Sequence, residues 1–185
     1  MCDPSDWFAL SQSGVGRPFQ GGPRWKTSER IIAEHPFCKD LEPAYVDLLI
    51  SCASNVRFEA DQRLFREGAE ANQFFLIREG TIALETSAPQ RGSIIVETVS
   101  EGEVLGWAWL VPPYRWHFTA RAVGPVRAIA LDGKCLRTKC QKNHDLWYEL
   151  LRRTIDIVGQ RLEATRFRLL DLYSAEVRET KLGSR

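Results

Sequence analysis

The sequence has few of the residues that metal binding and catalysis usually require. It contains only three histidines, and His35, His117 and His144 do not have the spacing of a metal site. No serine lies in a G-x-S-x-G turn, and no Walker-type phosphate loop is present. We therefore expect no metal, no cofactor and no enzymatic activity.

Long apolar runs and an excess of charge are also absent. The 25 basic and 24 acidic side chains give a formal net charge of +1, which offers no argument for nucleic acid or an anionic surface as partner. No apolar run approaches the length of a membrane span, and the N-terminus lacks the charged-then-apolar pattern of a signal peptide. We expect a cytoplasmic protein that does not bind membranes.

The cysteines do not form a recognisable framework. They are odd in number and scattered, and Cys135 and Cys140 lack the spacing of a zinc knuckle. A chain of 185 residues can bury a core without cross-links. We expect free thiols in or near the core at all five positions: Cys2, Cys38, Cys52, Cys135 and Cys140.

Residues 1–27 combine several glycines and prolines with aromatic side chains, among them Trp7 and Trp25. Glycine and proline disfavour helix and strand, whereas aromatic side chains are costly to leave in water. Two interpretations stay open, a disordered tail or a strap laid over the domain or a partner subunit.

Residues 28–142 carry the pattern of a helical entry, a β domain and a short helix. Helices are predicted over residues 28–35 and 43–53, and Asp132 is placed to cap a helix that ends near Cys140. Between them the apolar period is two, which predicts strands at residues 56–58, 64–65, 74–78, 81–86, 93–99, 114–122 and 126–131. Short strands joined by glycine turns are typical of an antiparallel barrel or jelly roll, a cupin-like double-stranded β-helix, so the fold class is mainly β with flanking α.

The stretch Gly102–Ala122, with sequence GEVLGWAWLVPPYRWHFTARA, is the most informative part of the chain. A short apolar turn that follows a glycine can point several backbone N–H groups at an anion. The stretch resembles the phosphate-binding cassette of cyclic nucleotide-binding domains, as found in the catabolite activator protein family and in protein kinase A regulatory subunits. The residues that match the family pattern are Gly102, Leu105, Gly106, Ala108, Leu110, Thr119, Arg121 and Ala122.

Two positions depart from that pattern. The resemblance implies a glutamate for the ribose hydroxyl after the second glycine, where this chain has Trp107. It implies an arginine for the cyclic phosphate where this chain has Trp116. Arg115 is adjacent, but neighbouring strand residues face opposite ways, so it would reach the site only through a slip or bulge.

The candidate pocket follows from the resemblance. The tryptophans either fill the emptied cradle as core or line a pocket for another small, planar ligand, and both alternatives stay open. The turn glycines expected to be structural are Gly68, Gly80 and Gly102. The candidate ligand-binding residues are Gly106, Trp107, Ala108, Trp109, Arg115, Trp116, His117 and Thr119.

Residues 143–173 are predicted to form one long helix, followed by a polar tail at 174–185. Apolar positions recur in steps of four and three, the spacing of a coiled-coil seam. The predicted homodimer interface consists of Leu151, Ile155, Val158, Leu162, Leu169 and Leu172. The residues after Tyr173 are too few for the helix-turn-helix of the activator family, so no DNA binding by that route is expected.

The expected function is that of a non-catalytic sensor or regulatory domain with an altered or lost cyclic nucleotide site, acting as a dimer or on a protein partner. One alternative is genuine binding of cyclic AMP or cyclic GMP, with Arg115 replacing the lost arginine. A second alternative is an enzyme with a cupin-like site.

Overall fold

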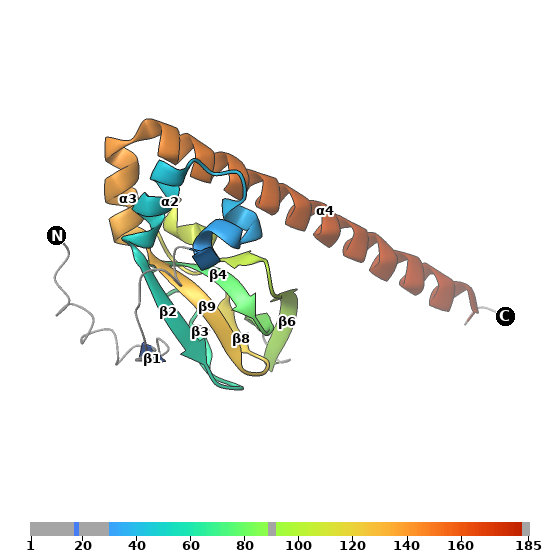
Figure 1. Ribbon diagram of the computed structural model, residues 1–185. Coiled ribbons are helices and arrows are strands. Elements are labelled where there is room, and N and C mark those ends of the chain that lie inside the picture. Colours follow the sequence, from blue (N-terminus) through green and yellow to red (C-terminus); the bar gives the residue numbers. More distant parts are fainter. Residues whose placement is uncertain (1–16, 19–29, 89–91, 183–185) are drawn as a thin grey trace. The chain divides into compact units, whose positions relative to one another are not determined.

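The computed structural model describes the backbone of residues 17–18, 30–88 and 92–182 and the side chains of residues 30–87 and 92–170 (Figure 1). The chain divides into two compact units, Met1–His144 and Asp145–Arg185, and each is treated separately below. Of the N-terminal segment 1–27, only Arg17–Pro18 (β1) is described, where it pairs with the strand Ala53–Phe58 (β2). Within the described ranges, no helix combines the length and apolar character needed to span a membrane.

The first unit is built on two antiparallel sheets, which confirms the predicted fold class. One sheet has the order β1-β2-β9-β4-β7 and the other has the order β3-β8-β5-β6. The remaining strands are β3 (Arg63–Phe65), β4 (Gln73–Glu79), β5 (Ile82–Ala88), β6 (Gly92–Val99), β7 (Val104–Leu105), β8 (Thr119–Ala122) and β9 (Val126–Asp132).

Most of the strands form where the sequence predicts them because their apolar side chains fill one core. Apolar residues from both sheets, among them Phe58, Phe75 and Ile82, are fully buried there. Burial of each such side chain stabilises the fold by roughly 1.5–3 kcal/mol. Turn glycines change the chain direction between strands, and at Gly80 a Cβ atom would lie 2.4 Å from the Pro125 carbonyl oxygen.

Short helices flank the sheets. Residues 30–34 are helical, a 3₁₀ turn follows at Pro36–Cys38 (η3), and the helices Pro43–Ile50 (α2) and Gly133–Lys142 (α3) come before and after the strands. Figure 1 shows α2 and α3 at the same end of the strands. The side chain of Asp132 accepts a 2.6 Å hydrogen bond from the backbone N–H of Cys135 and so caps α3 as predicted.

His35 fixes the entry to the domain. Its buried ring accepts a 3.2 Å hydrogen bond at Nδ1 from the N–H of Phe37, so Nε2 carries the hydrogen and donates to the carbonyl of Ile77 at 3.3 Å. Burial lowers the pKa of His35, and the hydrogen bonds to the carbonyls of Ile77 and Glu103 offset part of this shift. The ring therefore packs as the neutral form.

The prediction of free thiols is wrong for Cys52 and Cys135, which form a disulfide. The first residue of β2, Ala53, pairs with Leu131 at the end of β9, so Cys52 and the first turn of α3 are neighbours. Their Cα atoms lie 5.8 Å apart, a separation that a disulfide bridges without backbone movement. Cys38 and Cys140 are buried and form no disulfide, as expected, whereas Cys2 lies outside the described residues.

The predicted strand at residues 114–122 is also wrong in its first half. Only Thr119–Ala122 is β8, and Tyr114 has φ 55°, a left-handed conformation that does not continue a strand. The Pro112–Pro113 peptide bond is cis. The backbone of this segment bonds instead to the loop before β4, through the N–H of Ala71 to the carbonyl of Tyr114 at 2.7 Å.

The second unit is the helix His144–Leu182 (α4), which continues past Tyr173 into the predicted polar tail. Residues 174–182 contain neither glycine nor proline, so no helix-breaking residue ends it earlier. Of the proposed seam, Leu151 and Val158 are half-buried, Ile155, Leu162 and Leu169 are exposed, and the side chain of Leu172 lies outside the described residues. Phe167 and Leu170 are exposed as well.

Candidate functional site

The cassette-like segment begins with a left-handed glycine. Gly106 has φ 102° and ends β7, and the 3₁₀ turn Trp107–Trp109 (η4) follows it directly. A Cβ atom at Gly106 would lie 2.9 Å from the Gln73 carbonyl oxygen and 2.9 Å from Cη2 of Trp116. Only glycine fits here without displacing a neighbour, because both the backbone conformation and the surrounding space exclude a side chain.

Trp116 lies against this glycine and points into the core. Its ring stacks on Phe65 with centroids 3.7 Å apart and an interplanar angle of 10°, and it packs with the cluster that contains Leu105 and Ala108. The residue is 6% exposed. The indole therefore fills the space beside the Gly106 turn, at the position where the resemblance implies an arginine.

The backbone around Trp116 keeps the indole in this position. The backbone N–H of Trp116 donates to the carbonyl of Ala69 at 2.9 Å, and the backbone carbonyl of Trp116 accepts from the N–H of Gly68 at 2.8 Å. Neighbouring residues of an extended backbone point to opposite sides, so Trp116 faces the core, whereas Arg115 faces outward and is exposed. Its Nη1 atom donates to the carbonyl of Gly68 at 2.8 Å, so the guanidinium lies outside the core.

Trp107 and His117 form a second aromatic pair closer to solvent. Their ring centroids are 5.3 Å apart at an interplanar angle of 23°. Trp107 is half-buried and His117 is exposed. This pair places an apolar ring where the resemblance implies a carboxylate acceptor for a sugar hydroxyl.

The other predicted site residues have structural contacts. Ala108 is buried in the core beside Trp116, and Thr119 accepts a 3.1 Å hydrogen bond at Oγ1 from the N–H of Glu67. Trp109 does not lie beside Trp116. It packs on Phe74 with centroids 6.0 Å apart and is buried.

Arg121 is the one charged residue of the matched pattern whose side chain is held in an ion-pair network. Its guanidinium contacts Glu85 at 2.6 Å and Asp61 at 2.6 Å, and the hydroxyl of Ser93 donates to Glu85 at 3.0 Å. The hydrogen bond from Arg121 is the main reason that the pKa of Glu85 is lowered, although burial opposes the shift. The network joins β5, β6 and β8 and leaves the guanidinium of Arg121 committed to these carboxylates.

Sequence reasoning missed Arg137, which connects α3 to the cassette segment. Its Nη1 atom donates to the carbonyl of Trp109 at 2.9 Å and its Nη2 atom to Oδ1 of Asn72 at 3.2 Å. The guanidinium also lies 4.4 Å from the centroid of the Tyr114 ring. No local pattern marks this residue, because all three partners come from distant parts of the chain.

At the two positions where the resemblance implies a glutamate and an arginine, the structure has the rings of Trp107 and Trp116. Among the side chains that the structure describes, no group of three or more His, Cys, Asp or Glu residues is arranged to hold a metal ion. The backbone of the segment consists of the left-handed Gly106 and the 3₁₀ turn η4, and Arg137 of α3 bonds to it at the carbonyl of Trp109.

Comparison with known proteins agrees with the fold. Residues 55–143 match the family described as cyclic nucleotide-binding domain. The chain is 22% identical over 149 residues to a CRP-like cAMP-activated global transcriptional regulator of Mycobacterium tuberculosis, a match that covers 80% of this chain and 65% of that protein. The chain thus spans just under two thirds of the length of this curated relative.

Solved structures share the fold. One, from Geobacter metallireducens and described as a cyclic nucleotide-binding protein, has a TM-score of 0.66 at 26% identity, with 74% of this chain and 98% of that chain covered. Another is the sensor domain of the transcriptional regulator DNR from Pseudomonas aeruginosa, with a TM-score of 0.61 at 21% identity, covering 75% of this chain and 93% of that one.

Proposed function

Because residues 55–143 belong to the cyclic nucleotide-binding domain family, we propose that this chain is a regulatory domain in which the ordinary nucleotide site has been altered or lost. In this proposal the domain is not catalytic. It acts in the cytoplasm as a homodimer or on a protein partner, and any ligand is a small molecule other than the usual cyclic nucleotide.

The position of Trp116 is the observation that carries the proposal. A cyclic phosphate next to the Gly106 turn would have to displace an indole that is buried and stacked on Phe65. The guanidinium of Arg115 points away and is bonded to the carbonyl of Gly68, so it does not replace the missing cation in this conformation. An anion placed there would lose its water and gain no charged partner, which is unfavourable.

Trp107 supports the same conclusion from the sugar side. A carboxylate that accepts hydrogen bonds from a ribose hydroxyl contributes about 1.5–3 kcal/mol, and an indole cannot accept such a bond. Loss of both charged anchors would weaken binding by about 100- to 10,000-fold. We therefore expect cyclic AMP and cyclic GMP to bind weakly or not at all.

Genuine cyclic nucleotide binding is the second candidate, because the curated relative from Mycobacterium tuberculosis is cAMP-activated. In that case the Tyr114–Trp116 segment would need to shift so that Arg115 enters the site and Trp116 leaves it. The hydrogen bonds of Trp116 to Gly68 and Ala69 would have to break.

Calorimetric titration of the full chain with cyclic AMP and cyclic GMP separates the two candidates. We expect no heat of binding at micromolar concentrations, and a micromolar or tighter dissociation constant would refute the proposal. The double substitution Trp107→Glu and Trp116→Arg should gain affinity if the cassette backbone is intact. A matched control, Trp107→Glu with Trp116→Gln, removes the indole without supplying a cation and should gain much less.

The dimer is proposed from α4. Ile155 and Leu162 are each 59% exposed in the single chain, and they recur at the spacing of a coiled-coil seam. Such a stripe is costly to leave in water, and symmetric pairing is the commonest way to bury it. The exposed residues of α4 would then meet their equivalents around a two-fold axis.

Sedimentation tests the dimer. We expect a dimer at tens of micromolar and expect Leu162→Asp to give monomers with an unchanged circular dichroism spectrum, because the substitution buries two carboxylates at once. Gln160→Asp is the matched control, since residue 160 lies on the opposite side of the helix and is exposed. A monomeric wild type, or equal effects of the two substitutions, would contradict the proposed seam.

A further inference from the structure

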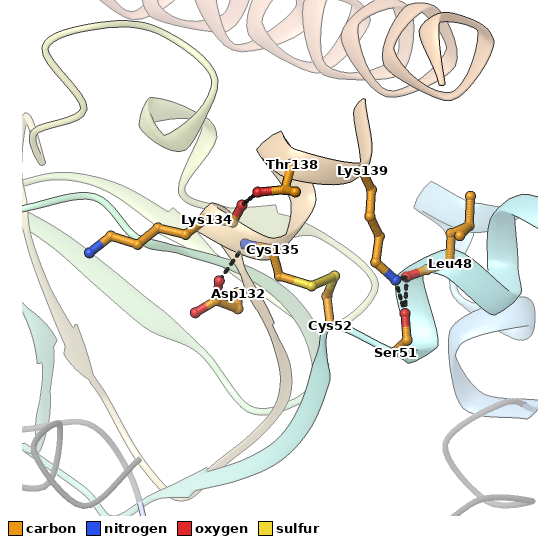
Figure 2. The surroundings of a disulfide bond; sticks show 8 residues. All are labelled: Leu48, Ser51, Cys52, Asp132, Lys134, Cys135, Thr138 and Lys139. Carbon is orange, nitrogen blue, oxygen red and sulfur yellow. Dashed lines mark hydrogen bonds between the residues drawn. A yellow bond between two sulfur atoms is a disulfide. The ribbon is translucent and has the colours of Figure 1, made fainter. Parts of the chain in front are cut away.

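The disulfide Cys52–Cys135 joins two segments that are distant in sequence but adjacent in the fold. Cys52 lies between the end of α2 and the start of β2, and Cys135 lies in the first turn of α3 (Figure 2). The two residues are separated by 83 positions in the sequence. The bond therefore fastens α3, which follows β9, to the residue before β2 at the same end of the β2–β9 ladder.

Contacts other than the sulfur–sulfur bond already hold these segments together. The N–H of Asp132 donates to the carbonyl of Cys52 at 2.9 Å, and the β2–β9 ladder ends beside it. Figure 2 also shows Lys139 reaching from α3 to the end of α2, where its ammonium donates to the carbonyl of Leu48 at 2.8 Å and to the hydroxyl of Ser51. After reduction these contacts would keep the two sulfur atoms close, so the bond can re-form without refolding.

The two cysteines differ in exposure. Cys52 is buried and Cys135 is half-buried, so Cys135 is the more exposed residue for an external thiol to approach. Of the other cysteines that the structure describes, Cys38 and Cys140 are both buried and in no disulfide, and burial raises the pKa of Cys140 to about 11. A thiol with so high a pKa is a poor nucleophile near neutral pH, so Cys140 would not compete in exchange with the Cys52–Cys135 pair.

We propose that Cys52 and Cys135 form a reversible redox switch whose partner is a dithiol protein of the thioredoxin class. In reduction, a thiolate of the partner attacks Sγ of Cys135, forms a mixed disulfide and releases Cys52 as a thiolate, which takes up a proton. The second thiol of the partner then attacks the mixed disulfide and releases Cys135. The pair gains two electrons and two protons, and the partner becomes a disulfide. Oxidation by a disulfide such as oxidised glutathione reverses these steps.

The output of the switch is the freedom of α3. Cys135 and Lys139 are one helical turn apart and share the side of α3 that faces α2. Arg137 reaches the cassette segment instead, through the carbonyl of Trp109 and the ring of Tyr114. Opening the disulfide removes the covalent hold on one side of the helix, and Arg137 transmits the added motion to the cassette. This inference does not depend on whether any nucleotide binds.

The test uses the full chain in its native state, equilibrated with glutathione buffers or with reduced thioredoxin. We expect native alkylation to label half-buried Cys135 after reduction, and not before it, and to leave the buried Cys38 and Cys140 unlabelled. Hydrogen exchange of the α3 amides and of residues 106–116 should become several-fold faster in the reduced protein.

Two variants isolate the effect. Cys52→Ala with Cys135→Ala should show the fast exchange pattern whether or not reductant is present. The matched control, Cys38→Ala with Cys140→Ala, should keep the full redox response, and native alkylation of the wild type decides the question if this control does not fold.

Three results would overturn the proposal. The first is a Cys52–Cys135 bond that opens only in denaturant, which would make it a permanent cross-link. The second is a pair that stays reduced at every glutathione ratio. The third is a pair that opens and closes without any change in hydrogen exchange of α3 and residues 106–116.

Discussion

Truncation of Trp116 to alanine is the most direct test of how the cassette is filled. The side chain is 6% exposed and stacks on Phe65 at 3.7 Å, so the substitution removes a buried indole from a close-packed core. Large-to-small substitutions of buried aromatic residues cost about 3–5 kcal/mol, because the surrounding side chains collapse only partly into the cavity. For a chain of this size we expect the midpoint of thermal unfolding to fall by about 10 °C.

Trp107→Ala is the matched control for this experiment. The residue belongs to the same 3₁₀ turn but is half-buried and stacks only on exposed His117, so its truncation should cost under about 1 kcal/mol. Urea unfolding followed by circular dichroism measures both variants. Equal losses for the two tryptophans would show that Trp116 does not fill the site.

Gly106→Ala adds an independent check on the position of the indole. The new Cβ atom would lie 2.9 Å from Cη2 of Trp116, so part of the cost of this substitution should disappear when Trp116 is already alanine. Residues in contact show coupling of about 0.5–3 kcal/mol in a double-mutant cycle. Strictly additive losses would refute the contact. The remaining cost reflects the positive φ and the nearby Gln73 carbonyl, which the tryptophan substitution does not change.

Other predictions concern stability. Replacing Cys52 and Cys135 by alanine should lower the free energy of unfolding by about 4–5 kcal/mol, because a disulfide that closes a loop of 83 residues restricts the unfolded chain. Equal chemical denaturation midpoints for the oxidised wild type and the variant would contradict this. Burial lowers the pKa of His35 in the folded state, so the unfolded state binds more protons below about pH 6.5 and stability should fall as the pH drops through this range. In His35→Gln, a curve of unfolding free energy against pH should fall less below about pH 6.5. Because the pKa of Glu85 is lowered in the folded state, its ionised carboxylate stabilises the fold above about pH 4.3, and this contribution should be lost as the pH falls below that value. Glu85→Gln should lack this acid-dependent loss when the free energy of unfolding is measured against pH.

Much of the fold could be predicted from sequence because its signals are local. Short apolar runs marked β4 and β9, and Asp132 was recognisable as the cap of α3. The disulfide was not predictable in the same way, because it depends on the pairing of β2 with β9. That pairing brings Cys52 and Cys135 together across most of the domain, and no pattern near either cysteine reports it.

In the candidate site, too, local features were predictable from sequence and long-range contacts were not. The family pattern located Gly106 and the two tryptophans at the anchor positions, since the cassette is contiguous in sequence. The structure of residues 114–118 was mispredicted because apolar alternation continues through a segment whose backbone partners, such as Ala69 and Ala71, lie in another loop. Arg137 escaped notice because its contacts are made only after α3 docks.

The pairing of β2 with β9 has a consequence for how the domain is made. In the first sheet, β9 is the strand that lies between β2 and β4, yet it is the last of the sheet's strands to be synthesised. During translation, β2 and β4 must therefore wait with unpaired edges until Asp132 has left the ribosome. Such long-range pairing slows folding and exposes apolar strands to aggregation in the meantime. A chain released just before Val126 would contain most of the core residues and still lack the strand that joins them.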